Sequence, residues 1–322
     1  MLASTPSNAT FIRPSRFYIN GFSNVPHVKY YYVFLCFAYV VTVFGNSFIM
    51  LVIYIDRTLH TPKYIVVFNL AVADFSGSTA LIPKVIDTFL FEAQYISYNE
   101  CLSYMFFVYL FSCVQSLTLV ALAYDRLIAI CFPLRYHAIV TKSAMIVLII
   151  ITWGIAAAVC CSCAALITRL SFCKSLVINS FFCDHGPTYK LACNDASINN
   201  IMAWIAFLVI FVLPVILITI TYVCIGITLV RIASGEERIK AMKTCTSHLM
   251  LVAIFYLPTF ATNIAAVATY IHPNARIINS SLSSIMPPML NPIIYTLKTE
   301  EVMVSIKKLY RRSKVTTAKS KK

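Results

Sequence analysis

The chain has 322 residues, of which 60% are hydrophobic and only 12% are charged, and its mean hydropathy is +0.80. A soluble domain carries far more charge, so this composition excludes one and indicates a protein with several membrane spans. The formal net charge of +14 is concentrated in segments predicted to lie on one side of the membrane. It therefore reports membrane topology and calls for no nucleic-acid partner.

Seven stretches of the chain are long and apolar enough to cross a bilayer as helices, which takes about 20 residues each. They are residues 30–55, 64–83, 101–124, 143–168, 196–230, 244–275 and 277–297. Asp74 interrupts the second stretch, and the others contain no Asp, Glu, Lys or Arg. We therefore predict an all-α membrane protein built as a bundle of seven transmembrane helices.

The bundle is expected to occupy residues 29–297, after a polar N-terminal tail at 1–28 that carries a glycosylation sequon at Asn8. Most Lys and Arg residues lie in segments that face the cytoplasm if this tail is extracellular. The positive-inside rule therefore predicts a multi-pass protein with an extracellular N-terminus.

The segment after the seventh stretch changes character. Between residues 298 and 312, Val302, Ile306 and Leu309 recur at helical spacing, with Lys and Arg opposite. This pattern predicts a short amphipathic helix on the inner membrane surface, where membrane lipid is its partner. Residues 313–322 are predicted to form a disordered, basic cytoplasmic tail.

Four of the twelve cysteines fall in segments predicted to lie outside the cell, namely Cys101, Cys173, Cys183 and Cys193. An even number of cysteines in an oxidising compartment indicates two disulfides, and the sequence alone leaves three pairings open. No grouping of His, Cys and acidic residues points to a metal site or a cofactor.

Three classes of function compete for such a chain: a receptor, a transporter or channel, and a membrane enzyme. Transporters usually show internal repeats and intramembrane charges along a pathway, and this chain shows no visible repeat and essentially one central acid, Asp74. No zinc-protease, paired-acid or nucleophile-elbow motif indicates an enzyme. The third stretch holds no acid to bind an amine, and the seventh holds no Lys to bind retinal.

The third stretch ends on Asp125 and Arg126, a pair that could simply mark the membrane boundary. The string AYDRLIAICFPLRYH around them, however, closely resembles the MAYDRYVAICxPLRY signature of odorant receptors, a branch of the rhodopsin-like G-protein-coupled receptors. Leu127 departs from it, since the family usually has Tyr there. Further matches follow in the family's order and cover about residues 20 to 310: GN at 45–46, LHTPKY at 59–64, NLAVADF at 69–75, KAMKTCTSHL at 240–249 and PPMLNPIIYTLKTEEV at 287–302.

The resemblance implies a receptor that binds a small-molecule odorant in the outer half of the bundle. It also implies coupling to a heterotrimeric G protein of the olfactory type, which raises cyclic AMP, and a place in the plasma membrane of olfactory cilia. FYLP at 255–258 and LKTEE at 297–301 look closer to the class I, fish-like branch. A non-olfactory class A receptor for a small soluble ligand is the main alternative, and a transporter ranks below it.

Several residue roles follow from the resemblance. It favours the disulfides Cys101–Cys183 and Cys173–Cys193. It implies an activation switch in which Asp125 restrains Arg126, with further members Tyr256, Pro258, Asn291, Pro292 and Tyr295. It also groups Asn46, Asp74, Gln115 and Asn291 into a polar cluster that binds sodium in many relatives. Gln115 replaces a frequent Glu, and a structural, hydrogen-bonded Asp74 is the alternative.

The expected ligand pocket combines helical spacing with the family's architecture. Its predicted residues are Met105, Val108, Tyr109 and Ser112 in the third stretch, Ala206 and Ile210 in the fifth, Tyr256, Thr259 and Asn263 in the sixth, and Asp184 and His185 after Cys183. The same stripes could instead serve only to pack helices. Unpaired polar side chains among them would favour a ligand or water as partner.

Overall fold

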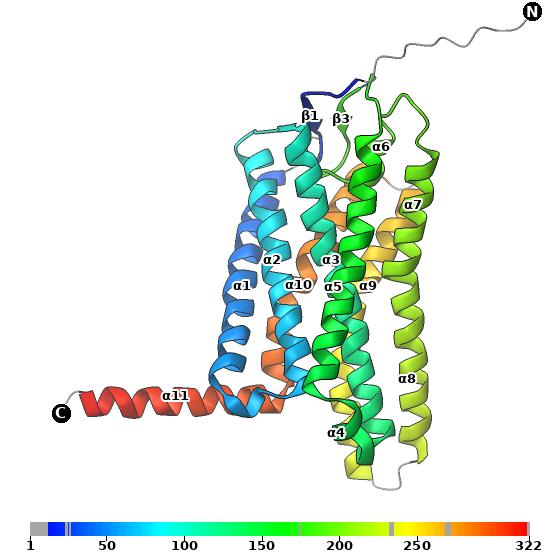
Figure 1. Ribbon diagram of the computed structural model, residues 1–322. Helices are drawn as coiled ribbons and strands as arrows, with labels where there is room; N and C mark the ends of the chain where they lie inside the picture. Colours follow the sequence, from blue (N-terminus) through cyan, green and yellow to red (C-terminus); the bar gives the residue numbers. More distant parts are fainter. Residues whose placement is uncertain are drawn as a thin grey trace, which may run out of the picture.

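The computed structural model describes residues 12–22, 25, 27–173, 175–231, 235–267 and 272–320. Within these ranges, seven helical spans run side by side as a bundle (Figure 1). They are α1 (Val28–Ile55), α2 (Pro62–Leu90), α3 (Tyr98–Cys131), α5 (Lys142–Thr168), the run of α7 (Ser197–Phe207), η3 (Leu208–Val212) and α8 (Leu213–Arg231), then α9 (Gly235–Val267) and α10 (Pro273–Lys298). Each predicted stretch corresponds to one span, so the predicted fold class is confirmed.

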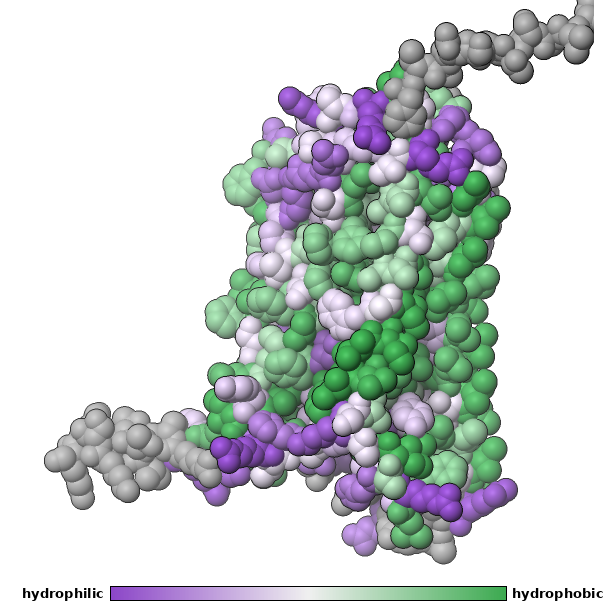
Figure 2. All heavy atoms as spheres, in the orientation of Figure 1, coloured by the Kyte–Doolittle hydropathy of each residue, from purple (hydrophilic) through white to green (hydrophobic). Residues whose placement is uncertain are grey.

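The surface of the bundle has the polarity that a bilayer requires. Six of the spans in the described residues are long and apolar enough to cross a membrane by length and composition. The seventh, α10, is more polar and includes Asn279, Ser281 and Asn291 among its residues. In Figure 2, hydrophobic side chains cover the flank of the bundle along α7 and α8, and hydrophilic ones gather at its two ends. The chain is therefore a multi-pass membrane protein.

Local sequence signals explain where the helices begin. Ser97 caps α3 by accepting a hydrogen bond from the backbone N–H of Glu100, in the spacing of a capping box. Thr141 caps α5 in the same way. Pro62 and Pro273 occupy the first positions of α2 and α10, where a missing N–H costs nothing.

Prolines inside the spans release backbone carbonyls that other helices then satisfy. Pro214 cannot bond the carbonyl of Ile210 four residues earlier, and the hydroxyl of Ser116 donates to that carbonyl instead. The preceding residues of η3 form a π-helix, as expected for a disturbed hydrogen-bond ladder. Pro292 frees the carbonyl of Pro288, which accepts a hydrogen bond of 3.0 Å from Nδ2 of Asn46.

A small sheet covers one end of the bundle. The strands β2 (Tyr95–Ser97), β1 (Arg16–Ile19) and β3 (Val177–Ile178) pair in that order, β1 antiparallel to β2 and parallel to β3. Phe17 and Ile19 of β1 point into the core beneath and are 1% exposed. We call this end the sheet end. Part of the predicted N-terminal tail is thus folded onto the bundle, whereas Asn8 lies outside the described residues.

The opposite end carries α11 (Glu300–Ser320), which projects sideways from the bundle in Figure 1; we call it the α11 end. Val302 is buried, and Ile306 and Leu309 pack against the core, as the predicted amphipathic pattern requires. The helix continues to Ser320, beyond its predicted end at residue 312. Residues 313–320 contain no Gly or Pro to break it, which accounts for the difference. Its position on the membrane surface stays a prediction.

Gly45 lets α1 approach α10 closely. A Cβ atom at this position would lie 2.8 Å from Cγ of Pro292. We expect Gly45→Ala to destabilise the protein by about 1–3 kcal/mol, the usual cost of overpacking. Gly154→Ala on α5 is the matched control, because nothing lies within 4 Å of a Cβ there. A lower unfolding temperature in detergent for Gly45→Ala alone would support this account, and equal temperatures would contradict it.

Candidate functional site

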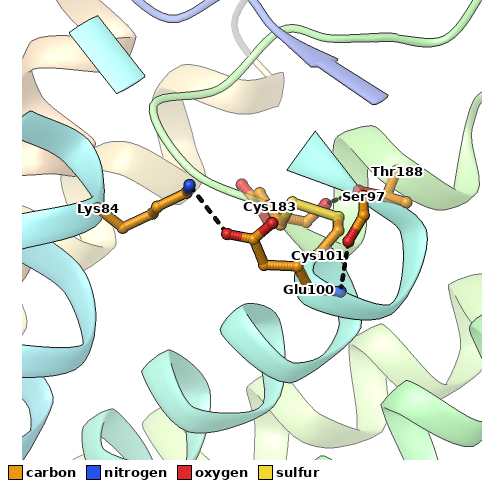
Figure 3. The surroundings of a disulfide bond; sticks show 7 residues. Lys84, Ser97, Glu100, Cys101, Cys183 and Thr188 are labelled. Atoms are coloured by element: carbon orange, nitrogen blue, oxygen red, sulfur yellow. Dashed lines mark hydrogen bonds and ion pairs between the residues drawn. A yellow bond between two sulfur atoms is a disulfide. The ribbon is translucent and has the colours of Figure 1, made fainter. Parts of the chain in front are cut away.

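A disulfide fixes the loop that follows β3 over the sheet end of α3. Cys101 and Cys183 are joined, with their Cα atoms 5.5 Å apart and both side chains fully buried. Figure 3 shows Lys84 of α2 reaching toward Glu100 beside this disulfide, and the Lys84 Nζ to Glu100 Oε1 distance is 2.9 Å. A second disulfide joins Cys173 and Cys193 within the loop. Both expected pairs are therefore present.

The disulfide brings the start of α6 (His185–Tyr189) close to α3. Asp184 caps α6 by accepting from the backbone N–H of Gly186, and its Oδ1 also accepts a hydrogen bond of 2.6 Å from the Tyr109 hydroxyl. Burial raises the pKa of Asp184 above its usual value, although hydrogen bonds from Tyr109 and Gly186 act in the opposite direction. Two predicted pocket residues, Tyr109 and Asp184, are thus in contact.

Two buried side chains near α6 carry polar atoms that have no hydrogen-bond partner among the described residues. One is His185, whose Nε2 is unpaired although the residue is only 5% exposed. The other is Asn199 at the start of α7, where both amide atoms are unpaired and the residue is fully buried. Such groups are costly unless they meet a partner. Asn199 was not predicted as a site residue, because a polar residue near the start of a hydrophobic stretch looks like part of the membrane boundary.

Burial lowers the pKa of His185 from its usual 6.5 to about 4. The folded protein then takes up fewer protons than the unfolded chain between pH 6.5 and 4, so this residue makes the protein less stable as the pH falls through that window. We expect a loss of about 2 kcal/mol between pH 7 and pH 5 relative to His185→Gln. Unfolding temperatures of the two proteins across this range would check it; parallel pH curves would contradict it.

A hydrogen-bonded node joins three helices below α6. The hydroxyl of Ser116 on α3 donates to the carbonyl of Ile210 in η3, so its oxygen must accept from Tyr256 of α9, 2.7 Å away. Tyr256 is 3% exposed and Ile210 1%. The predicted residues Tyr256 and Ile210 are therefore brought together by Ser116, which was not predicted because a lone serine in a span carries no distinctive signal.

The other predicted pocket residues are placed as follows. Met105 is buried in the core, while Val108, Ser112 and Ala206 are half-buried. The hydroxyl of Thr259 donates to the carbonyl of Phe255, and Nδ2 of Asn263 donates to the carbonyl of Thr259. Both side chains therefore donate to the preceding turn of their own helix, as helical side chains of this kind can do, and these two donors do not call for a ligand or water as partner. Asn263 is also exposed.

The polar cluster around Asp74 is partly as expected. Asp74 is fully buried and its Oδ2 accepts a hydrogen bond of 2.7 Å from Nδ2 of Asn291, while Gln115 also interacts with the carboxylate. Oδ1 has no partner among the described residues. Nδ2 of Asn46 instead bonds the carbonyls of Thr42 and Pro288, because the latter is released by Pro292. Sodium binding stays a prediction.

The charge pair at the α11 end is formed. Nη2 of Arg126 lies 3.6 Å from Oδ2 of Asp125, which is 1% exposed. The other oxygen of Asp125 accepts a hydrogen bond of 2.7 Å from the hydroxyl of Tyr136 in α4 (Tyr136–Ile139). Tyr295 of α10 is half-buried, and its hydroxyl has no partner among the described residues. Asp125 is therefore held by Arg126 and by the loop after α3.

Hydrogen bonds of His248 link α3, α8 and α9 near this pair; we call them the His248 bridge. Its residues were not predicted. Nε2 of His248 lies 3.1 Å from the carbonyl of Leu119, so it must donate to that carbonyl. Nδ1 of His248 lies 2.8 Å from the hydroxyl of Tyr222, and the two rings are stacked. The rule that each ionisable residue within a span is a functional candidate would have identified His248.

The helix α11 is attached to the start of α2. Oε2 of Glu301 lies 2.6 Å from Nζ of Lys63 and accepts a hydrogen bond from the hydroxyl of Tyr64. Burial would raise the pKa of Glu301, but these hydrogen bonds and the charges of Lys63 and Arg126 lower it below its usual value. The carboxylate therefore remains charged at neutral pH and keeps α11 against the bundle.

Comparison with known proteins identifies the family. A family model described as olfactory receptor matches residues 35–313. Human olfactory receptor 51F2 is 36% identical over 94% of this chain and 89% of its own length. Human olfactory receptor 1J1 is 36% identical over 85% of each chain, and mouse olfactory receptor 1E16 is 32% identical over 97% of this chain and 98% of its own.

A crystal structure of squid rhodopsin has the same fold, with a TM-score of 0.73, 17% sequence identity, and coverage of 91% of this chain and 88% of that one. The seven-helix architecture is therefore the fold of squid rhodopsin. The family model matches most of the chain, and the relatives are more than 30% identical to it. The chain therefore belongs to the olfactory receptor family.

Proposed function

We propose that this receptor binds a small odorant in the half of the bundle nearest the sheet end and then activates a heterotrimeric G protein at the α11 end. The sheet end faces the outside of the cell, since both disulfides lie there, and the basic α11 end faces the cytoplasm. Coupling to an olfactory, stimulatory G protein raises cyclic AMP, and the receptor works in the plasma membrane of olfactory cilia.

The observation that carries this proposal is the node of Ser116, Tyr256 and Ile210. It joins α3, η3 and α9, and two of its members, Tyr256 and Ile210, belong to the predicted pocket. A ligand that displaces the Tyr256 ring changes the hydrogen bonds of all three helices at once. Tyr256 lies two residues before Pro258, where α9 lacks a backbone hydrogen bond and can bend. The node therefore connects ligand contact to the position of α9.

The polar groups near the pocket favour a neutral odorant with hydrogen-bonding atoms. Oδ1 of Asp184 already accepts hydrogen bonds from Tyr109 and from the backbone of Gly186, so we expect this carboxylate to fix the loop on α3 rather than to bind a cationic ligand. His185 is neutral at physiological pH because burial lowers its pKa to about 4. Its unpaired Nε2 and the unpaired amide of Asn199 are partners for a hydroxyl or carbonyl group.

The test is a screen of soluble odorants on cells that express the receptor with an olfactory-type G protein, read as cyclic AMP. With any agonist found, Tyr109→Ala, His185→Ala and Tyr256→Ala should reduce potency or efficacy at matched surface levels. Phe107→Ala is the control, because Phe107 lies on the same helix as Tyr109 and is 47% exposed. If all three variants keep wild-type responses, the ligand binds elsewhere.

A further inference from the structure

A hollow of about 370 Å³ lies between α8 and α9, away from the predicted odorant pocket. Five of its lining residues come from α8 and two from α9. Ile218, which is 3% exposed, belongs to its inner wall. Val223 and Leu249 are 55% and 43% exposed, so the hollow reaches the flank of the bundle that faces the bilayer.

The walls of the hollow offer no polar group to a ligand. The only hydroxyls there belong to Thr219 and Tyr222. The hydroxyl of Thr219 donates to the carbonyl of Val215, and that of Tyr222 lies 2.8 Å from Nδ1 of His248. Both hydroxyls therefore already have hydrogen-bond partners. A ligand in the hollow would meet aliphatic side chains and the ring of Tyr222. Such a space repels water and accepts hydrocarbon.

The surrounding medium decides which hydrocarbon fills it. Both helices are membrane spans. In the run from α7 to α8, only 17% of the apolar 18-residue stretch that would cross the membrane is buried inside the protein. The rest of that surface meets lipid tails, which run alongside the opening between Val223 and Leu249. An empty hollow would deprive its lining of dispersion contacts, whereas a seated chain restores them.

We propose that one acyl chain of a membrane phospholipid lies in this hollow, between α8 and α9. The chain packs on the ring of Tyr222, whose hydroxyl bonds His248, and His248 in turn bonds the carbonyl of Leu119 on α3. The lipid thus supports one wall of the His248 bridge that holds α9 against α3. The hollow shares no lining residue with the predicted odorant pocket, and its occupancy can be measured without a signalling response.

The test uses the purified full-length receptor in detergent and a phosphatidylcholine with a photoreactive diazirine in the middle of one acyl chain. Labelled peptides are mapped by mass spectrometry as the lipid is titrated. We expect saturable labelling of residues 215–223 and 249–252 that unlabelled phosphatidylcholine displaces. Val223→Trp and Leu249→Trp, which fill the hollow from opposite walls, should each weaken this labelling about tenfold.

Ile220→Trp is the matched control, since Ile220 is 56% exposed on the same helix and does not line the hollow. It should label like the wild type, and equal unfolding temperatures verify that all variants are folded. Labelling that never saturates, or that falls equally in the control, overturns the site. Displacement by a free fatty acid but not by phosphatidylcholine overturns its assignment to phospholipid.

Discussion

Replacing Cys101 or Cys183 with serine is expected to remove most of the receptor from the cell surface. Both residues are fully buried in the core at the sheet end, and the disulfide closes a loop with a sequence separation of 82. Loss of such a disulfide typically costs about 2–5 kcal/mol, which is a large part of a protein's total stability. The loop that carries Asp184 and His185 would also lose its covalent attachment to α3.

The measurement is surface staining beside total expression. Cys173→Ser should have a smaller effect, because that disulfide closes a shorter loop, with a separation of 20, and Cys173 is exposed. Cys224→Ser is the control, since Cys224 is a free, exposed cysteine on α8. Wild-type surface levels for Cys101→Ser would show that this disulfide is dispensable for folding.

The number and order of the spans could be predicted because a bilayer restricts a chain to apolar helices of a minimum length. The ends of the spans were harder to place. The second stretch was expected to end at residue 83, yet α2 continues to Leu90. Lys84 is the reason: its charge is tolerated at the sheet end, where it pairs with Asp87 and Glu100. A rule that stops a span at the first charge misses such pairs.

The small sheet gave no usable signal in the sequence. Its strands have two to four residues, too few for an alternating pattern, and they come from segments far apart in the chain. Their pairing depends on the bundle and the disulfides that bring those segments together. Short strands with long-range partners are therefore visible only in the folded structure.

The sequence predicted where candidate site residues lie on their helices, but it did not predict which residues they would bond. Helical spacing placed Tyr109 on one face of α3 with Met105, Val108 and Ser112, but it could not show that Asp184 would accept its hydrogen bond. The family resemblance grouped Asn46 with Asp74 in one polar cluster. The structure shows that Asn46 instead completes the backbone of α10 at a carbonyl that Pro292 leaves free. Accounting for each freed carbonyl would have favoured this partner.

Replacing Asp125 with asparagine is expected to raise signalling without odorant. Asparagine keeps the volume of Asp125 and an oxygen that can accept from the Tyr136 hydroxyl, so it removes only the charge that attracts Arg126. If Asp125 restrains Arg126 in the resting receptor, loss of about 1–2 kcal/mol shifts the ratio of active to resting receptor about 5–30-fold. Arg126→Ala should instead abolish coupling, because it removes the guanidinium that activation is expected to release toward the G protein.

Tyr136→Phe provides a second test of the same restraint. It removes the hydroxyl that holds Oδ1 of Asp125 but leaves both charges, so it should raise basal cyclic AMP less than Asp125→Asn. Arg135→Ala is the matched control, because Arg135 is an exposed cation in the same loop. All variants are compared at matched surface levels. If basal cyclic AMP is unchanged in Asp125→Asn and odorant responses persist in Arg126→Ala, the pair only marks the membrane boundary.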